Sequence, residues 1–455
     1  MIIFSCAKQR KKTDTVIYGF RLFDPLQKSY FPTYRDKNVL SLQMLLSEQI
    51  LNVIIKKKGG GIMTRLRLCR TGSILLKLFL LFTSVFSVLY LCDLLSEPFG
   101  FSEWETARAV FIIKTVLIVV FCSTLFWVGI ILEYLFCNQL RAKKRILGIV
   151  FGWIPIINII MLIDIIATSD REYRFERKKI FLNRERQDLK ICRTAYPILL
   201  VHGVFFRDFE HINYWGRIPS ELEKNGAEIY YGNHNSASSV HESAVQLRQR
   251  ISEIVSNSGC EKVNIIAHSK GGLDVREMLS DPETAKHVAS VTTVSTPHRG
   301  CRFADYLFER VPPKGQQQIA MLYNTAAERL GDTDPDFLTA TRDLTHEKCA
   351  EMNELLKDPE GIFCQSFGSV QHRASSGRFP LNMTHLFVKQ FDGENDGLVG
   401  VESFEWGSRY TLLKPKGLRG ISHGDMVDLC RENIRGFDVR EFYVKLVSDL
   451  REMGF

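Results

Sequence analysis

Residues 263–272 read Val-Asn-Ile-Ile-Ala-His-Ser-Lys-Gly-Gly, and this stretch decides the fold. An apolar strand runs into a serine, and small residues follow where a helix would begin. A strand-to-helix turn this tight admits only small side chains two positions before and two positions after its central residue. Such a turn raises the Ser269 hydroxyl above the sheet, with the positive end of the next helix dipole beneath it. We therefore predict a nucleophile elbow made of Ala267, His268, Ser269, Lys270 and Gly271.

Strands and helices alternate on both sides of this turn. This alternation predicts an α/β fold with a mainly parallel sheet and helices on both faces. Residues 302–384 lack the alternation, so we interpret them as an insertion, helical at first and polar later. The expected strands are 197–201, 228–231, 262–267, 288–295 and 385–389, and the expected helices include 243–255, 270–280 and a closing amphipathic helix at 439–453.

A serine nucleophile needs a base that takes its proton and a carboxylate that orients the base. When the serine lies on an elbow of this kind, the acid and then the histidine follow it along the chain. Asp396 lies in a turn after the expected strand at 385–389, and Asp392 and Glu394 in the same loop are rivals for the role. His423 is the one histidine after Asp396, so we predict by elimination that it is the base.

The oxyanion of an acyl-transfer reaction needs two backbone N–H donors. We expect one from Lys270, the residue after the nucleophile. The other should come from the loop after the first strand, where Val204 is the best candidate. His202 lies at the end of that strand, so we interpret it as structural.

The charge divides the chain into two unlike parts. Residues 1–196 hold 30 Lys+Arg and 15 Asp+Glu, whereas residues 197–455 hold 29 and 36. The basic part is also the more apolar one, and the mean hydropathy of −0.04 averages over both. Basic residues beside apolar runs indicate a membrane surface, so we expect no nucleic-acid partner.

Two apolar runs, about 73–92 and 109–132, are long enough to cross a hydrocarbon core of about 30 Å. A third run at 146–163 contains Pro155, which breaks or kinks a helix. We assign 63–170 to a membrane region, 171–195 to a basic linker and 196–455 to the soluble domain.

Positive charge predicts the orientation of these runs. Three arginines at 65–70 precede the first run, four acids at 93–105 separate the first two, and four basic residues at 141–145 follow the second. Seven basic residues at 171–186 would lie outside if the third run crossed. We therefore expect two spans and a third segment that does not cross, with the soluble domain facing the cytoplasm.

Residues 1–62 carry no motif, and we interpret them as a poorly structured leader or non-native extension. The triplets that encode Lys58-Gly59-Gly60 can contain GGAGG, a bacterial ribosome-binding sequence, just before Met63. Met63 is then the expected start.

The eleven cysteines show no Cys-x-x-Cys spacing, which gives no support for a zinc or redox motif. We expect them to be reduced and mostly buried.

Several motifs together resemble the bacterial triacylglycerol lipases of the α/β-hydrolase fold. The resemblance implies hydrolysis of lipid-like carboxylic esters, a lid formed by the insertion, and an acid in Asn-Asp-Gly, which favours Asp396. Asp425 matches one calcium-ligand position of the family, but no partner aspartate lies at the matching place before Asp396, so we expect no metal or other cofactor. The motifs are 196–203, 213–219, 226–230, 267–272, 295–300 and 395–399.

These observations predict a membrane-anchored serine carboxylic-ester hydrolase that acts through an acyl-enzyme in the bacterial cell membrane. Its expected partners are a lipid or other acyl ester and the bilayer. Two alternatives stay open: an acyltransferase that uses the same three residues, and a catalytically idle hydrolase-like domain used for binding.

Overall fold

The structure is a computed structural model that describes residues 61–96, 104–204, 214–329, 331–377 and 381–455. The chain divides into two compact units, Met1–Ile62 and Met63–Phe455. The predicted leader lies outside the described residues except for its last two positions.

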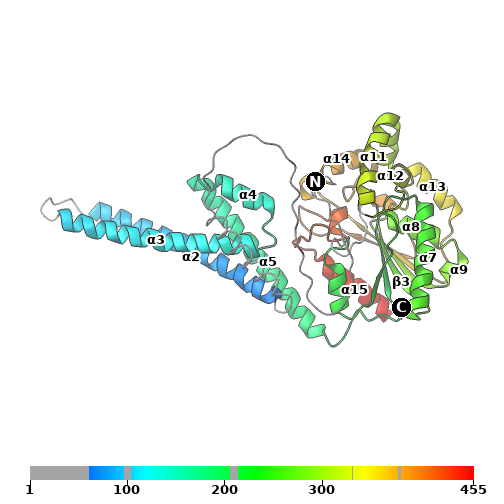
Figure 1. The fold of residues 1–455 in the computed structure, drawn as a ribbon, viewed down its shortest axis with the longest axis horizontal. Helices are drawn as coiled ribbons and strands as arrows, with labels where there is room; N and C mark the ends of the chain where they lie inside the picture. Colours follow the sequence, from blue (N-terminus) through cyan, green and yellow to red (C-terminus); the bar gives the residue numbers. More distant parts are fainter. Residues whose placement is uncertain (1–60, 97–103, 205–213, 330, 378–380) are drawn as a thin grey trace, which may run out of the picture. The chain divides into compact units, whose positions relative to one another are not determined.

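A six-stranded sheet forms the centre of the domain (Figure 1), and every neighbouring pair of strands is parallel. The strand order is β2-β1-β3-β4-β5-β6. Because parallel strands end at the same edge, the loops after β1, β3 and β6 come together there. The strands are β1 (Ile198–Val201), β2 (Ile229–Tyr231), β3 (Val263–His268), β4 (Val288–Val294), β5 (Phe363–Ser369) and β6 (Arg409–Leu413).

Side chains of alternating residues enter two different cores, one on each face of the sheet. Ile198 and Leu200 pack with α6 and α15, whereas Leu199 and Val201 pack with α7 and α8. The sheet is therefore covered on both faces, and the predicted α/β arrangement is confirmed. The covering helices are α6 (Ile218–Lys224), α7 (Val240–Ser258), α8 (Lys270–Met278) and α15 (Val439–Glu452), with the short α9 (Pro282–Ala285) before β4.

The expected strand at 385–389 is wrong, because this segment belongs to the helix α14 (Leu381–Asp392). The buried positions His385 and Val388 are three residues apart, which is the spacing of a helix face and not of a strand. The acid loop therefore follows a helix, and β6 is the strand that comes after it.

Four helices follow β4 before the chain re-enters the sheet. The interpretation of the whole of 302–384 as an insertion is also wrong in one part, because Phe363–Ser369 forms β5 between β4 and β6. β5 is almost fully buried, but its mixture of small and polar residues lacks the apolar pattern that predicts a buried strand. The four helices are α10 (Arg302–Arg310), α11 (Pro313–Arg329), α12 (Phe337–Arg342) and α13 (His346–Leu355).

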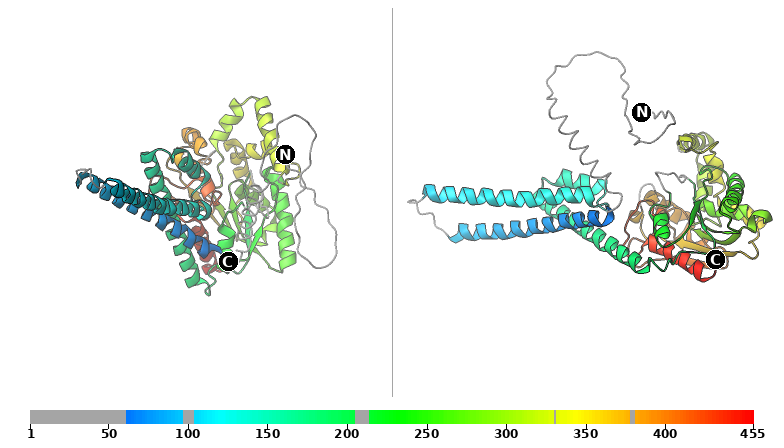
Figure 2. Two further views of the ribbon diagram at one scale, coloured as in Figure 1. Left: turned by 60° about the vertical axis from the view of Figure 1, so that its left-hand side comes forward. Right: turned by 60° about the horizontal axis from the view of Figure 1, so that its bottom comes forward.

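Two long N-terminal helices, α2 (Gly61–Ser96) and α3 (Trp104–Phe136), lie antiparallel and side by side (Figure 2). Ring contacts such as Phe82 with Phe121, 5.3 Å between centroids, hold them together. Gly61–Cys92 and Ala109–Phe136 are long and apolar enough to span a membrane. Only 6% and 11% of their most apolar windows are buried, which is unlike a core helix of a soluble protein.

The third apolar run is divided between two helices, α4 (Ala142–Phe151) and α5 (Pro155–Arg186), as Pro155 led us to expect. The two helices form a hairpin, and Lys144 of α4 reaches Asp164 of α5 at 2.6 Å. At the turn, the Trp153 side chain is 87% exposed.

Residues 171–186, most of the segment 171–195 expected to be a basic linker, form instead the second half of α5, which packs on the domain that contains the sheet. The Glu176 carboxylate accepts hydrogen bonds from the two terminal guanidinium nitrogens of Arg440 at 3.1 and 3.2 Å. Lys179 and Arg186 both pair with Glu441. The excess of basic residues in this segment concealed that several of them are buried with acidic partners of the domain.

Candidate active site

Ser269 has the strained backbone of a nucleophile elbow. It lies between β3 and α8 with φ +56° and ψ −132°, a conformation that L-residues rarely adopt. Strain of this kind is found where the surrounding structure holds a functional residue in place. A methyl group on Gly271 would lie 2.3 Å from the His202 carbonyl oxygen, so the small residue expected there is required.

Asp396 and His423 form a buried acid–base pair. His423 Nδ1 lies 2.8 Å from Asp396 Oδ2, and the His423 backbone N–H donates to the Asp396 carbonyl at 2.8 Å. The other carboxylate oxygen accepts the N–H groups of Leu398 and Val399. The Asp396 carboxylate is therefore fixed in one orientation, and it can fix the imidazole in turn.

His268 links the serine to the histidine, because its ring contacts His423 and its backbone is joined to Ser269. The ring centroids of His268 and His423 are 4.6 Å apart, and His268 directly precedes Ser269 in the chain. Within the described residues, no hydrogen bond joins the Ser269 hydroxyl to His423. Such catalytic bonds are often long before substrate binds, so this geometry does not exclude the pair.

The two expected oxyanion donors belong to the loop after β1 and to the start of α8. Lys270 is the first residue of α8, so its N–H has no acceptor within the helix. The N–H of Gly203 donates to the Tyr214 hydroxyl at 3.1 Å, so this N–H is already paired, and the next residue, Val204, stays the candidate donor. The Val204 side chain packs against residues of the α11 and α12 helices.

The two rival acids have other partners. Asp392 accepts the N–H groups of Arg302 and Phe303 at the start of α10. Glu394 is paired with Lys414 at the surface. Within the part of the chain that the structure describes, neither carboxylate bonds to His423, whereas Asp396 does.

Asp425, the weak calcium candidate, does not fit a calcium ligand. Arg419 binds both of its carboxylate oxygens at 2.7 and 3.1 Å, and the Ser422 N–H and hydroxyl also donate to it. The guanidinium group of Arg419 therefore already neutralises the Asp425 carboxylate, in the place that a calcium ion would take. The contacts fix the loop that carries His423.

Tyr214 and Asn395 support the site, although the sequence analysis gave them no role. The Tyr214 hydroxyl lies 2.7 Å from His268 Nδ1 and also receives the Gly203 N–H, so it joins the elbow to the oxyanion loop. Asn395 Oδ1 contacts His385 and accepts the N–H of Gly397. Both residues lie in motifs that carried the family resemblance, which was the available signal.

Several buried histidines surround the site, and burial disfavours their charged form. His202 contacts the carbonyl oxygens of Gly203 and His234, as expected for a structural residue. Burial, together with the nearby His234, lowers the pKa of His202 to about 3. Burial also lowers the pKa of His268 and His298, where His423 and Arg276 add to the effect.

We expect these histidines to make the fold sensitive to acid. Each lowered pKa lies below the unfolded value near 6.5, so the unfolded chain binds more protons and stability falls as the pH drops below about 6.5. For His202 the loss should reach about 1.4 kcal/mol per pH unit down to about pH 3. Urea unfolding of the full chain in detergent at pH 7.5, 6 and 5 measures it.

His298→Gln supplies the matched test, because this residue is buried but outside the proposed triad. The variant should lose part of the pH slope, whereas His241→Gln, at a largely exposed histidine, should keep it. An equal slope in wild type and His298→Gln would contradict the assignment.

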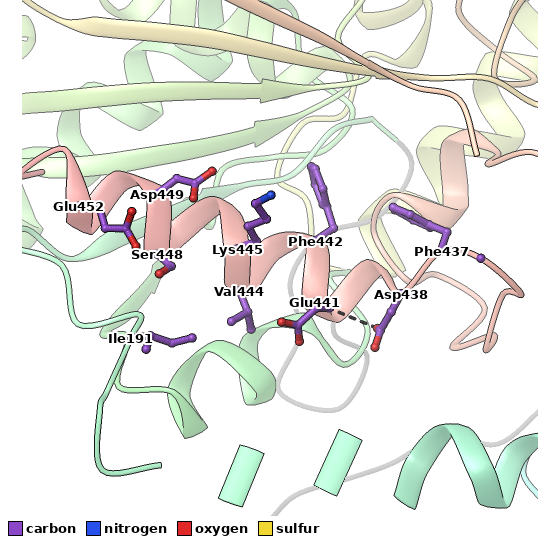
Figure 3. A pocket seen from close by; sticks show the side chains of 11 residues that line it. Ile191, Phe437, Asp438, Glu441, Phe442, Val444, Lys445, Ser448, Asp449 and Glu452 are labelled. Atoms are coloured by element: carbon purple, nitrogen blue, oxygen red, sulfur yellow. Dashed lines mark hydrogen bonds between the residues drawn. The ribbon is translucent and has the colours of Figure 1, made fainter. Parts of the chain in front are cut away.

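A surface hollow of about 530 Å³ lies along α15, remote from the elbow in the chain (Figure 3). Its lining includes Glu441, Lys445, Asp449 and Ile191, and it contains none of the predicted catalytic residues. Apolar side chains such as Phe437 and Phe442 also line the hollow. Because no predicted catalytic residue reaches it, we do not assign the substrate to it.

The six-stranded parallel sheet, with the strained serine turn after β3, defines residues 196–455 as an α/β-hydrolase domain. No family model matches the chain. It is 34% identical over 172 residues to a triacylglycerol lipase of Pseudarthrobacter phenanthrenivorans, which is 35% of this chain and 53% of that protein. It is 31% identical over 198 residues to a triacylglycerol lipase of Vibrio cholerae, covering 41% and 62% of the two chains.

The crystal structure of Staphylococcus hyicus lipase matches with a TM-score of 0.45 and 18% identity, over 57% of this chain and 96% of that one. The chain spans about half the length of the Pseudarthrobacter relative. The predicted resemblance to bacterial triacylglycerol lipases is therefore confirmed by sequence.

Proposed function

We propose that the protein is a membrane-anchored serine carboxylic-ester hydrolase that acts on lipid-like esters. The observation that carries the proposal is the strained Ser269 turn at the same sheet edge as the buried Asp396–His423 pair. The similarity to proteins named triacylglycerol lipase supports the reaction class.

In the proposed mechanism, Ser269 Oγ attacks the ester carbonyl carbon while His423 Nε2 takes the hydroxyl proton. Asp396 holds the imidazole through Nδ1 and stabilises the imidazolium. The N–H groups of Lys270 and Val204 stabilise the oxyanion. His423 then gives its proton to the leaving alcohol, and the same steps with water release the acid from the acyl-enzyme.

Exposed apolar side chains near the site support a lipid substrate. On α11, Met321 and Leu322 are 68% and 74% exposed, and on α14, Leu386 and Phe387 are similarly exposed. α11 belongs to the insertion that packs on Val204 of the oxyanion loop. A lid of this kind can contact acyl chains and the candidate oxyanion donor together.

A fluorophosphonate probe and a series of p-nitrophenyl esters test the proposal on the full chain in detergent. We expect wild type to be labelled and to hydrolyse the esters, with Ser269→Ala as the unlabelled control. Failure of the folded wild type to label would favour the idle binding domain. Faster acyl transfer to an added alcohol than to water would favour the acyltransferase.

The anchor in this proposal consists of α2 and α3 as two spans. The α4–α5 hairpin then enters the membrane surface and returns on the same side, with the exposed Trp153 at its tip. Tryptophan favours the interface between lipid and water. The basic residues on both sides of the hairpin then lie in the cytoplasm, together with the hydrolase domain.

Extraction of the protein from cell membranes should require detergent, because two apolar helices insert far more firmly than a surface patch. High salt or alkaline carbonate should leave it in the membrane pellet, and release by either treatment would contradict the spans.

The side of the membrane on which the hydrolase domain lies can be tested with Ser256→Cys, which places an exposed thiol on α7. An impermeant reagent should label it beyond wild type only after permeabilisation, and labelling of intact cells would reverse the orientation.

A further inference from the structure

Four side chains, two thiols and two carboxyl groups, lie together where the N-terminal part of α2 and the C-terminal end of α3 pack against α5. Cys69 comes from α2, Glu133 from α3, Cys137 from the residue after α3, and Glu172 from α5. The side chains are 0–1% exposed. Buried groups of this kind are costly unless they are paired or bind a metal ion. The cluster shares no residue with the proposed active site.

The donor atoms are as close together as the ligands of one ion. One donor atom each from Cys69, Cys137 and Glu172 lies within 4.8 Å of the other two. Cys137 Sγ is 3.1 Å from Glu172 Oε2, and Cys69 Sγ is 3.8 Å from Glu133 Oε2. Tetrahedral zinc with its usual bond lengths separates neighbouring sulfur and oxygen ligands by about 3.5 Å and two sulfurs by about 3.8 Å. Small shifts of these three donors would bring them to one ion, and Glu133, which contacts Cys69, is the candidate fourth ligand.

Glu133 supplies an independent observation, because it is a fully buried carboxyl group with an unsatisfied oxygen. Its Oε1 has no hydrogen-bond partner among the described residues. An unpaired buried acceptor of this kind requires an explanation such as an ion. A cation between Glu133 and the two cysteines would supply the missing partner.

The second carboxylate is already oriented as metal ligands commonly are. Glu172 Oε1 receives Arg65 Nη1 at 2.5 Å, and its Oε2 accepts the N–H of Gln139 at 2.8 Å. Ser169 Oγ lies 3.1 Å from Cys69 Sγ. Outer contacts of this type fix ligand geometry and raise metal affinity.

We propose that Cys69, Cys137, Glu133 and Glu172 bind one thiophilic divalent cation of the zinc class. Two sulfur and two oxygen donors in a closed, buried site fit tetrahedral zinc and not the all-oxygen ligand sets of calcium or magnesium. On binding, each thiol loses its proton to solvent as the sulfur–metal bond forms.

The site would be structural and would tie the anchor helices to the hydrolase domain. Gln139, whose N–H orients Glu172, also bonds through its side chain to Arg431 and Asn433 of the domain. Arg141 donates to the Cys430 carbonyl oxygen at 2.6 Å. These domain residues follow the loop that carries His423. The ligands come from three helices, which explains why cysteine spacing gave no sign of them.

Metal content and Co²⁺ spectroscopy of the full chain in detergent test the proposal. We expect about one zinc per chain as isolated, and Co²⁺ added after zinc removal should give the intense near-ultraviolet absorption of thiolate-to-cobalt charge transfer. Cys69→Ser and Cys137→Ser should each weaken zinc binding by more than about 100-fold, beyond the 10–100-fold typical of outer contacts. The matched controls are Cys122→Ser, a buried cysteine of α3 outside the cluster, and Cys192→Ser, whose side chain is buried against the core of the hydrolase domain.

A measurement on the wild type keeps the test decisive if the serine variants do not fold. Bound zinc should protect Cys69 and Cys137 from alkylation, as read by peptide mass spectrometry, and zinc removal should expose both. A folded chain that binds no zinc or cobalt at micromolar concentration would overturn the proposal. So would a Cys69–Cys137 disulfide in the isolated protein, or binding unchanged in Cys69→Ser/Cys137→Ser.

Discussion

Ser269→Ala should reduce ester turnover by about 10⁴-fold or more while leaving the fold intact. In the proposed mechanism the Ser269 hydroxyl forms the acyl-enzyme, and its removal also leaves His423 without a proton to accept. Alanine is small enough for the strained turn, so unfolding by urea should match that of wild type. Initial rates on p-nitrophenyl butyrate, with the unfolding curve beside them, measure both effects.

Ser295→Ala is a matched control for this substitution. Ser295 also has positive φ, +51°, and lies buried at the end of β4. If a change at any strained serine of the sheet edge were enough to lower the activity, Ser269→Ala and Ser295→Ala would lower it equally. Activity of Ser269→Ala within about tenfold of wild type would refute Ser269 as the nucleophile.

The elbow could be predicted because local sterics determine it. The turn after β3 tolerates only small neighbours, and Gly271 touches the His202 backbone so closely that no other residue fits. The alternation of apolar strands with helices likewise predicted the sheet, because a parallel sheet needs such crossovers.

Elements with weaker local signals were not predicted. The run His385–Lys389 is apolar enough for a strand, and only its burial at helical spacing identifies α14. β5 is rich in small and polar residues, so its place between β4 and β6 depends on contacts made across the sheet.

The distant partners of some residues could not be predicted from the local sequence. Tyr214 matters because its hydroxyl reaches both His268 and Gly203, and no local pattern around Tyr214 indicates those contacts. The buried Glu176–Arg440 pair joins residues 264 positions apart, so net charge suggested a linker where a packed helix lies.

Asp396→Asn should lower turnover by about 10⁴-fold although the side chain keeps its size. In the proposed site, the Asp396 carboxylate accepts a hydrogen bond from the Nδ1–H of His423, which leaves Nε2 without a proton and able to act on the serine. An asparagine amide that donates to Nδ1 would force the proton onto Nε2, the wrong tautomer for a base. Combined with Ser269→Ala, the loss should not add, because the residues act as a unit.

Asp392→Asn is the matched control in the same loop, and it decides between the two acids. Asp392 accepts two N–H groups at the start of α10, and asparagine retains one acceptor oxygen, so the expected loss is a modest change in stability with turnover within about tenfold. The pH profile distinguishes the catalytic acid from a structural carboxylate. Only in Asp396→Asn should the residual rate depend more strongly on hydroxide concentration, because hydroxide can replace the missing base. If Asp392→Asn proved the more damaging substitution, the acid of the site would be Asp392, and the contact of 2.8 Å between Asp396 and His423 would be structural.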